Sequence, residues 1–194
     1  MIDFERKEHY GLSDLLRIVA LLRSEDGCPW DRVQTHESLR AGMLEEAYEV
    51  VEAIDNKDLA NLREELGDVL LQVVFHAHIE EERGGFDLTD VINEECEKMI
   101  RRHPHVFLEE SENNHAKSID KVLEKWENIK VQERGDKRVT SRMEKVPKAL
   151  PALTRANKIQ KRAAESGFDW DDISGAFDKV KEELIGLIGE NRVN

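Results

Sequence analysis

Apolar residues recur at intervals of three and four along almost the whole chain, which is the spacing of one face of an α-helix. The clearest example lies between Leu12 and Ser24, where five aliphatic side chains share one face. The same spacing predicts further helices over about 38–55, 58–83, 87–102, 118–134, 152–166 and 174–189. Asp58 stands where an N-cap residue is expected before the 58–83 helix. Because no segment shows the alternation of a strand, the pattern predicts an all-α fold.

The predicted helices divide the chain into three parts. Residues 1–110 form the first, with four long helices and the acidic motifs described below. Residues 111–150 form a helix followed by a linker, since 135–151 hold one Gly, two Pro and little periodicity. Residues 151–194 form the third part, with two more helices.

The third part repeats features of the first. The loop Gly27-Cys-Pro-Trp-Asp31 is echoed by Gly167-Phe-Asp-Trp-Asp171, and Glu45-Glu46 is echoed by Glu182-Glu183. The two offsets are nearly equal, at 140 and 137 residues. They predict a duplicated helical unit, with coincidence in an acidic chain as the alternative. The second copy reaches Asn194 before its second half would begin, so we expect it to be partial.

Composition restricts the partners and the compartment. The net charge of −13 argues against nucleic acid as the main partner, but a phosphate ligand stays possible if metal ions supply the positive charge. Cys28 and Cys96 form no CxxC pair, so we expect neither disulfides nor a zinc site, and a cytoplasmic location. The charged N-terminus and the absence of any run of roughly 18 apolar residues predict no signal peptide and no membrane span.

The acidic residues of the 38–55 helix differ in the side of the helix that they occupy. At 100° per residue, Glu46 falls between Val50 and Ala53, inside the apolar arc, and Glu49 falls at the edge of that arc. Glu45 lies on the polar side, where a solvated role is sufficient. The pattern therefore singles out Glu46 and Glu49 as acids on a face that we expect to be buried.

The 58–83 helix carries a second pair of acids. Residues 66–75 include only two polar side chains, so this helix should be buried on most sides. Glu65, Asp68 and Gln72 share one narrow stripe, and no Lys or Arg lies between Glu64 and Ala77. An ionised carboxylate in such a place is costly unless it is paired or bound to a metal.

The two pairs of acids are predicted to face each other. The spacer between Glu49 and Glu65 is long enough for a turn and an antiparallel return. Oxygen ligands alone favour Mg²⁺ or Mn²⁺, whereas a di-iron bundle would need a His where Asp68 stands. A buried polar cluster neutralised by an Arg from another helix is the alternative. For His76 and His78 we expect a structural or surface role.

The run Glu45-Glu46-Ala-Tyr-Glu49, followed by Glu65-Leu-Gly-Asp68, resembles the EExxE…ExxD motif of the MazG nucleotide pyrophosphohydrolases. Further matching motifs are Gly27-Cys-Pro-Trp-Asp31, Gln34-Thr-His36, Phe86-Asp87, Arg101-Arg-His-Pro-His-Val-Phe107, Lys158-Ile-Gln-Lys-Arg162 and Gly167-Phe-Asp-Trp170. The resemblance runs nearly end to end. It implies a dimeric four-helix-bundle core and Mg²⁺-dependent release of pyrophosphate from NTPs or dNTPs. It also implies that Glu46, Glu49, Glu65 and Asp68 bind the metal.

The remaining roles are hypotheses. Glu45 or Glu49 is expected to help remove a proton from the attacking water. Lys98, Arg101 and Arg102 are candidates for the triphosphate, with a cation cluster at a helix C-terminus as the alternative. Trp30 is a candidate for stacking on the base, with a loop anchor as the alternative.

The second copy departs from the family motif. Gly186 stands where a third Glu belongs, and no ExxD follows, so we expect no working second site. Tandem members need not have two equally active copies, so the first site is not guaranteed to be the working one. Two other functions stay open: a catalytically degenerate dimerisation or regulatory module, and a narrower dUTP or phosphoribosyl-ATP pyrophosphohydrolase.

Overall fold

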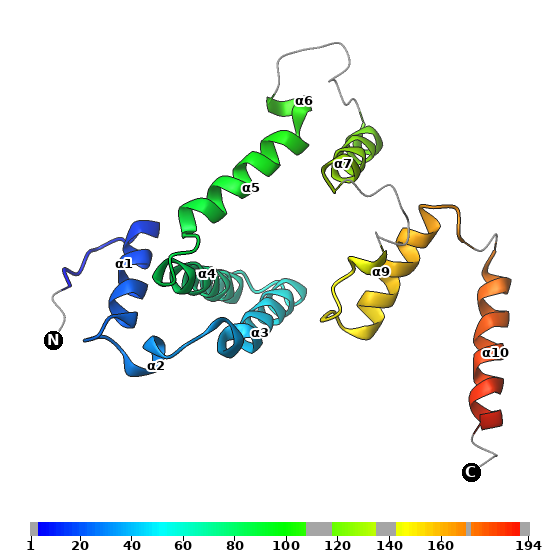
Figure 1. The fold of residues 1–194 in the computed structure, drawn as a ribbon, viewed down its shortest axis with the longest axis horizontal. Helices are drawn as coiled ribbons and strands as arrows, with labels where there is room; N and C mark the ends of the chain where they lie inside the picture. Colours follow the sequence, from blue (N-terminus) through cyan, green and yellow to red (C-terminus); the bar gives the residue numbers. More distant parts are fainter. Residues whose placement is uncertain (1–3, 108–117, 135–142, 170–171, 191–194) are drawn as a thin grey trace. The chain divides into compact units, whose positions relative to one another are not determined.

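The computed structural model describes residues 4–107, 118–134, 143–169 and 172–190, and the regular structure in these ranges is helical (Figure 1). The predicted all-α class is confirmed. Within these ranges, no helix combines the length and the apolar character needed to cross a membrane. The chain divides into two compact units, Met1–Phe107 and Leu108–Asn194, which are described separately. Residues 108–117, the first half of the predicted 135–151 linker, and Trp170 and Asp171 fall outside the described residues.

The first unit contains six helices: α1 (Leu12–Arg23), α2 (Pro29–Arg32), α3 (His36–Asp55), α4 (Leu59–Glu82), α5 (Leu88–Arg102) and α6 (Pro104–Phe107). The long helices match the predicted ones to within two residues at each end. The periodicity did not predict α2 and α6, because one turn of helix is too short to show a repeat.

The two longest helices, α3 and α4, form an antiparallel hairpin, and they are the most closely associated pair in the unit. Thr35 caps α3 through its side chain, which accepts a hydrogen bond from the Ser38 amide. Asp58 caps α4, as predicted, by accepting from the amides of Ala60 and Asn61 at 3.1 Å. Lys57, with a φ of 56°, adopts the left-handed conformation that reverses the chain between the two helices.

The core of this unit lies where α1 crosses the C-terminal half of α4. Val19 of α1 and Val74 of α4 are fully buried, and Ile79 is 2% exposed. Phe75 and Ala77 of α4, Leu39 of α3 and Leu88 of α5 complete the cluster. Because the α4 residues of this core lie beyond Gln72, the half of the hairpin nearer its turn has little cover of its own.

The second unit contains α7 (Ile119–Arg134), α9 (Ala152–Ala164) and α10 (Ile173–Glu190). Val146, at 1% exposure, and Ala163 are buried in this unit. On α10, the apolar residues Ile173, Phe177, Val180 and Leu184 are exposed. The interpretation of this unit as a partial repeat stays a prediction.

Candidate metal site

Three carboxyl groups meet between α3 and α4. Glu46 and Glu49 project from one turn of α3, and Glu65 projects from the facing turn of α4. One carboxylate oxygen of each lies within 4.8 Å of the others. The i, i+3 spacing and the tight turn at Lys57 produce this arrangement, since they bring the same face of each helix to the same level of the hairpin.

Two of these acids, Glu46 and Glu65, have a raised pKa. Burial raises the pKa of Glu46, and the carboxylates of Asp68, Glu49 and Glu45 raise it further. The pKa of Glu65 is also raised, first by burial and then by Glu49, Asp68 and Glu46. The charged neighbours responsible are all carboxylates. This site therefore concentrates negative charge instead of pairing it.

The structure corrects the predicted burial of these residues. Glu46, Glu49, Glu65 and Asp68 are half-buried, and Glu45 is exposed. The apolar residues around them on the outer faces of the hairpin are also exposed, including Leu66 at 53% and Leu70 at 43%. The helical wheel places a residue on an apolar face correctly, but it does not show whether the single chain has anything to cover that face.

The acid cluster fits a hard divalent cation. Mg²⁺ binds oxygen at about 2.0–2.1 Å in an octahedron, so its opposite ligands lie about 4.2 Å apart. The three carboxylate oxygens lie within 4.8 Å of one another, which is close to that span. Small side-chain rotations would bring them to the separation that Mg²⁺ requires. The raised pKa values of Glu46 and Glu65 indicate uncompensated negative charge, which a cation would neutralise.

A polar seam continues from the acid cluster along the hairpin. Gln72, one turn beyond Asp68, packs against Gly42 so closely that a Cβ on Gly42 would lie 3.0 Å from the Gln72 amide nitrogen. Further along, the Nδ1 atoms of His36 and His76 are 2.7 Å apart, and His36 Nε2 is 2.7 Å from a Glu80 oxygen. The motif residue His36 thus ties the start of α3 to α4, and His76 has the predicted structural role.

Trp30 does not anchor its loop. Its side chain is 66% exposed on the short helix α2, which removes the alternative role that we considered for it. The anchor is Arg23, at 7% exposure, whose guanidinium binds Glu82 of α4 at 2.7 and 3.0 Å. Sequence reasoning missed Arg23, because an arginine in the last turn of a helix is common and its partners lie far along the chain.

The predicted phosphate-binding cations lie away from the acid cluster. Lys98, Arg101 and Arg102 occupy the C-terminal half of α5, which extends from the end of α4 away from the hairpin (Figure 1). Lys98 forms an ion pair with Glu95. Lys98 and Arg101 line a shallow depression of about 420 Å³ that none of the five motif acids of α3 and α4 reaches.

The second copy of the motif shows no comparable cluster among the residues that the structure describes. Glu182 and Glu183 of α10 are both paired with Lys179, at 2.7 and 3.4 Å, and their side chains are 69% and 71% exposed. Gly186 contributes no ligand, and no heavy atom lies within 4 Å of a Cβ built on it.

Comparison with known proteins connects this geometry to a family. The model of the MazG nucleotide pyrophosphohydrolase domain matches residues 34–107, which include α3, α4 and every acid of the cluster. The chain is 49% identical to the nucleoside triphosphate pyrophosphohydrolase/pyrophosphatase MazG of Thermotoga maritima, over 90% of this chain and 65% of that protein. It is 46% identical to the nucleoside triphosphate pyrophosphohydrolase of Escherichia coli, over 92% and 66%.

A solved structure is similar as well. The crystal structure of a mazG-related protein from Thermotoga maritima matches with a TM-score of 0.50 and 34% identity, over 61% of this chain and 98% of that chain. The chain spans just under two thirds of the length of the curated relatives above.

Proposed function

The chain belongs to the MazG nucleotide pyrophosphohydrolase family, and we propose that it hydrolyses nucleoside triphosphates to a nucleoside monophosphate and pyrophosphate. The acid cluster between α3 and α4 is the observation that carries the proposal. The names of the relatives support a triphosphate substrate. The cellular role that follows is control or clean-up of the nucleotide pool, in the cytoplasm, for which the free thiols Cys28 and Cys96 are suited.

In this proposal Glu46, Glu49, Glu65 and Asp68 hold Mg²⁺, with Mn²⁺ as a substitute. A bound divalent cation neutralises phosphate oxygens and makes water a better nucleophile at neutral pH. The half-buried position of the four acids suits this role, because they are shielded enough to attract a cation and open enough for a nucleotide to reach it.

The reaction breaks the bond between the α-phosphorus and the oxygen that bridges it to the β-phosphorus. Water attacks the α-phosphorus, its proton passes to a carboxylate, and pyrophosphate leaves with the bridging oxygen. Of the two acids considered for this proton, we assign Glu45. Glu49 is one of the three converging ligands, whereas Glu45 is exposed beside them and close enough to raise the pKa of Glu46.

The substrate contacts come from other elements. We assign base stacking to Trp30, because an exposed indole offers a large flat surface. Lys98, Arg101 and Arg102 stay our candidates for triphosphate contact, although within one chain they lie away from the acid cluster. Exchanging the exposed Lys98–Glu95 pair for a phosphate contact is inexpensive, since such pairs contribute about 0–1 kcal/mol.

We further propose that the chain acts as a homodimer. Leu44, Tyr48 and Val51 line the outer side of α3 at 50–60% exposure, and Leu66 and Leu70 continue the apolar surface on α4. A second hairpin packed on this surface would give a four-helix bundle. Tyr48→Glu should convert the dimer to a monomer in multi-angle light scattering. A monomeric parent protein at micromolar concentration would contradict the proposal.

The function is tested by measuring pyrophosphate release from a panel of NTPs and dNTPs, with Mg²⁺ and with EDTA. We expect Mg²⁺-dependent release from several nucleotides. Release from dUTP or phosphoribosyl-ATP alone would identify a narrower enzyme. No release from any substrate would favour the degenerate module, provided that circular dichroism shows a folded protein.

A further inference from the structure

The turn that carries Trp30 has little stability of its own. Helix α2 has four residues, and a single helical turn is not stable in water without support. Yet the Trp30 side chain is 66% exposed, so packing of the indole does not fix the turn. Contacts made by its neighbours must hold it in place.

One set of these contacts is made by the backbone at the start of the turn. The Cys28 amide donates to the Leu22 carbonyl at 2.7 Å. A Cβ on Gly27 would lie 2.3 Å from the carbonyl oxygens of Leu21 and Leu22, so only glycine allows this approach. This contact fixes where the turn leaves α1.

The other set is made by Arg23 at the end of the turn. Its Nη1 donates to the carbonyls of Asp31 and Gln34, at 2.7 and 3.2 Å. The Asp31 carbonyl belongs to the last turn of α2 and also accepts from the Gln34 amide at 3.3 Å. The same guanidinium binds Glu82 through Nε and Nη2, so one side chain connects α1, α2 and α4.

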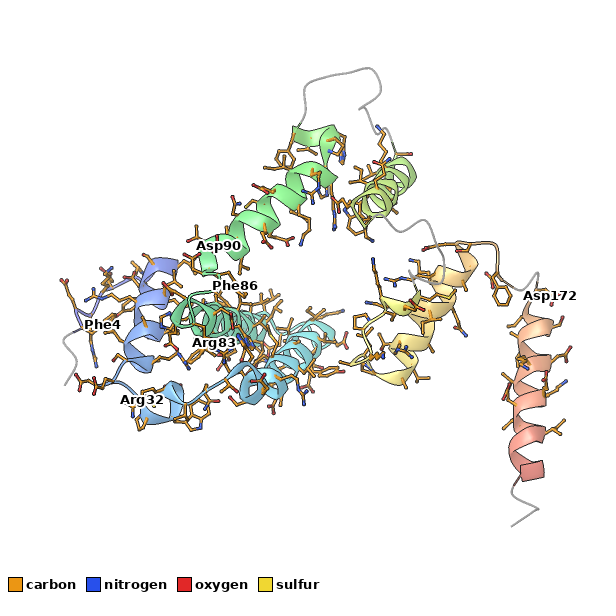
Figure 2. The ribbon with its side chains drawn as sticks, viewed as in Figure 1. Phe4, Arg32, Arg83, Phe86, Asp90 and Asp172 are labelled. Carbon is orange, nitrogen blue, oxygen red and sulfur yellow. The ribbon has the colours of Figure 1, made fainter. Side chains whose placement is uncertain are left out.

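Smaller contacts complete the support of the turn. The Gln34 side chain donates to the Trp30 carbonyl at 3.0 Å. Arg32, labelled on α2 in Figure 2, donates to the Glu25 carbonyl at 2.6 Å. The same Gln34 side chain accepts from the Ser38 hydroxyl of α3 at 2.6 Å, so Gln34 connects the turn to the first helix of the hairpin. Arg23 is the side chain that connects the turn to α1 and to α4, the second helix of the hairpin that carries the acid cluster.

From this clamp we infer that Arg23 is a positioning residue for substrate binding, which holds Trp30 in a fixed orientation toward the nucleoside part of the substrate. The inference rests on the proposed function. It holds whether Trp30 serves the acid cluster of its own chain or that of a second copy, because both arrangements need an ordered Trp30. A fixed aromatic side chain loses little entropy on binding, whereas a mobile turn must be ordered each time.

Arg23→Lys is the most informative variant. Lysine keeps a positive charge beside Glu82, but its single ammonium lacks the planar fork that reaches two carbonyls and a carboxylate together. We expect KM to rise by roughly tenfold, equivalent to about 1.4 kcal/mol, with kcat nearly unchanged. Arg17→Gln is the matched control, since Arg17 is an exposed arginine on the same helix. It should leave both constants unchanged.

Combination with Trp30→Ala separates positioning from general stability. If Arg23 acts through Trp30, Arg23→Lys should add no further rise in KM once Trp30 is alanine. Additive effects, or a fall in kcat at constant KM, would overturn the inference. An unchanged KM in the Trp30→Ala variant would also overturn it, while Mg²⁺-dependent pyrophosphate release would still support the proposed function.

A second readout does not need activity. With Trp126 and Trp170 replaced by phenylalanine, Trp30 is the only tryptophan, which can be excited selectively over the two tyrosines. Its time-resolved anisotropy should show faster local motion in Arg23→Lys than in Arg17→Gln. Equal local motion in the two variants would refute the inference, even if the protein releases no pyrophosphate.

Discussion

Glu46→Gln should stabilise the metal-free protein and at the same time abolish its stabilisation by Mg²⁺. Glutamine keeps the shape of the side chain and removes a charge from a site where the neighbouring Asp68, Glu49 and Glu45 all repel it. Most substitutions at a half-buried position destabilise a protein. A gain in stability is therefore a specific signature of electrostatic repulsion at this position.

The magnitude follows from the spacing and exposure of the acids. Two like charges about 4 Å apart repel by about 1 kcal/mol in bulk water and by about 4 kcal/mol at a dielectric constant of 20. Because Glu46 is only half-buried, solvent screening moves the value toward the lower figure. We expect a gain of about 1 kcal/mol, which raises the melting temperature of a unit of this size by about 4 °C.

The assay is thermal denaturation followed by circular dichroism, in EDTA and in Mg²⁺. The parent should melt higher in Mg²⁺, because a ligand that binds only the folded state stabilises it. Glu46→Gln should melt above the parent in EDTA and should not respond to Mg²⁺. Glu52→Gln, on the exposed side of the same helix, is the control and should respond as the parent does.

The dependence on pH gives the same prediction an independent check. The folded-state pKa of Glu46 is raised, so the repulsion is fully present above that pKa and disappears as the pH falls below the ordinary value of 4.5. The advantage of Glu46→Gln over the parent in EDTA should therefore shrink as the pH falls toward 4.5. A variant that melts below the parent in EDTA, or that still responds to Mg²⁺, would refute the reasoning.

Other predictions address the remaining parts of the molecule. Glu49→Gln should abolish nearly all pyrophosphate release, whereas Glu183→Gln should change it little; the opposite result would place the chemistry in the second copy. Burial and then the charge of His36 lower the pKa of His76, so the unfolded chain binds more protons and stability is lost as the pH falls below 6.5. The loss should be smaller in His76→Asn when melting temperatures in EDTA are compared at pH 7.5 and 5.5. Gly27→Ala should lower the free energy of unfolding in urea by about 1–3 kcal/mol through overpacking. Gly67→Ala, with no heavy atom within 4 Å of its Cβ, should raise it by up to about 1 kcal/mol.

The sequence was sufficient for the features that depend on local spacing. The interval of three between Glu46 and Glu49, and between Glu65 and Asp68, defines one face of a helix whatever the rest of the chain does. The short connection capped by Asp58 then requires an antiparallel return. The convergence of Glu46, Glu49 and Glu65 follows from these facts, whereas their role in metal binding stays a prediction.

Features that depend on distant partners were not predicted. His36 and His76 are 40 residues apart, and Arg23 and Glu82 are 59 apart, so no local pattern relates them. No local pattern shows how much of each helix is covered within one chain. The exposure of Leu66 differs from the expected burial for this reason.

The hairpin must hold together two rows of acids that repel each other, and its remaining contacts explain how it does so. Beside the turn, Ala53 packs at 1% exposure. At the other end, Leu39 is buried and His36 binds both His76 and Glu80. Attractive contacts on both sides of the acid cluster thus keep its carboxylates near a fixed spacing without a cation. A site ordered before binding needs no reorganisation when charge arrives. In the metal-free state, holding the carboxylates together costs free energy because they repel one another. Glu46→Gln would remove part of that cost.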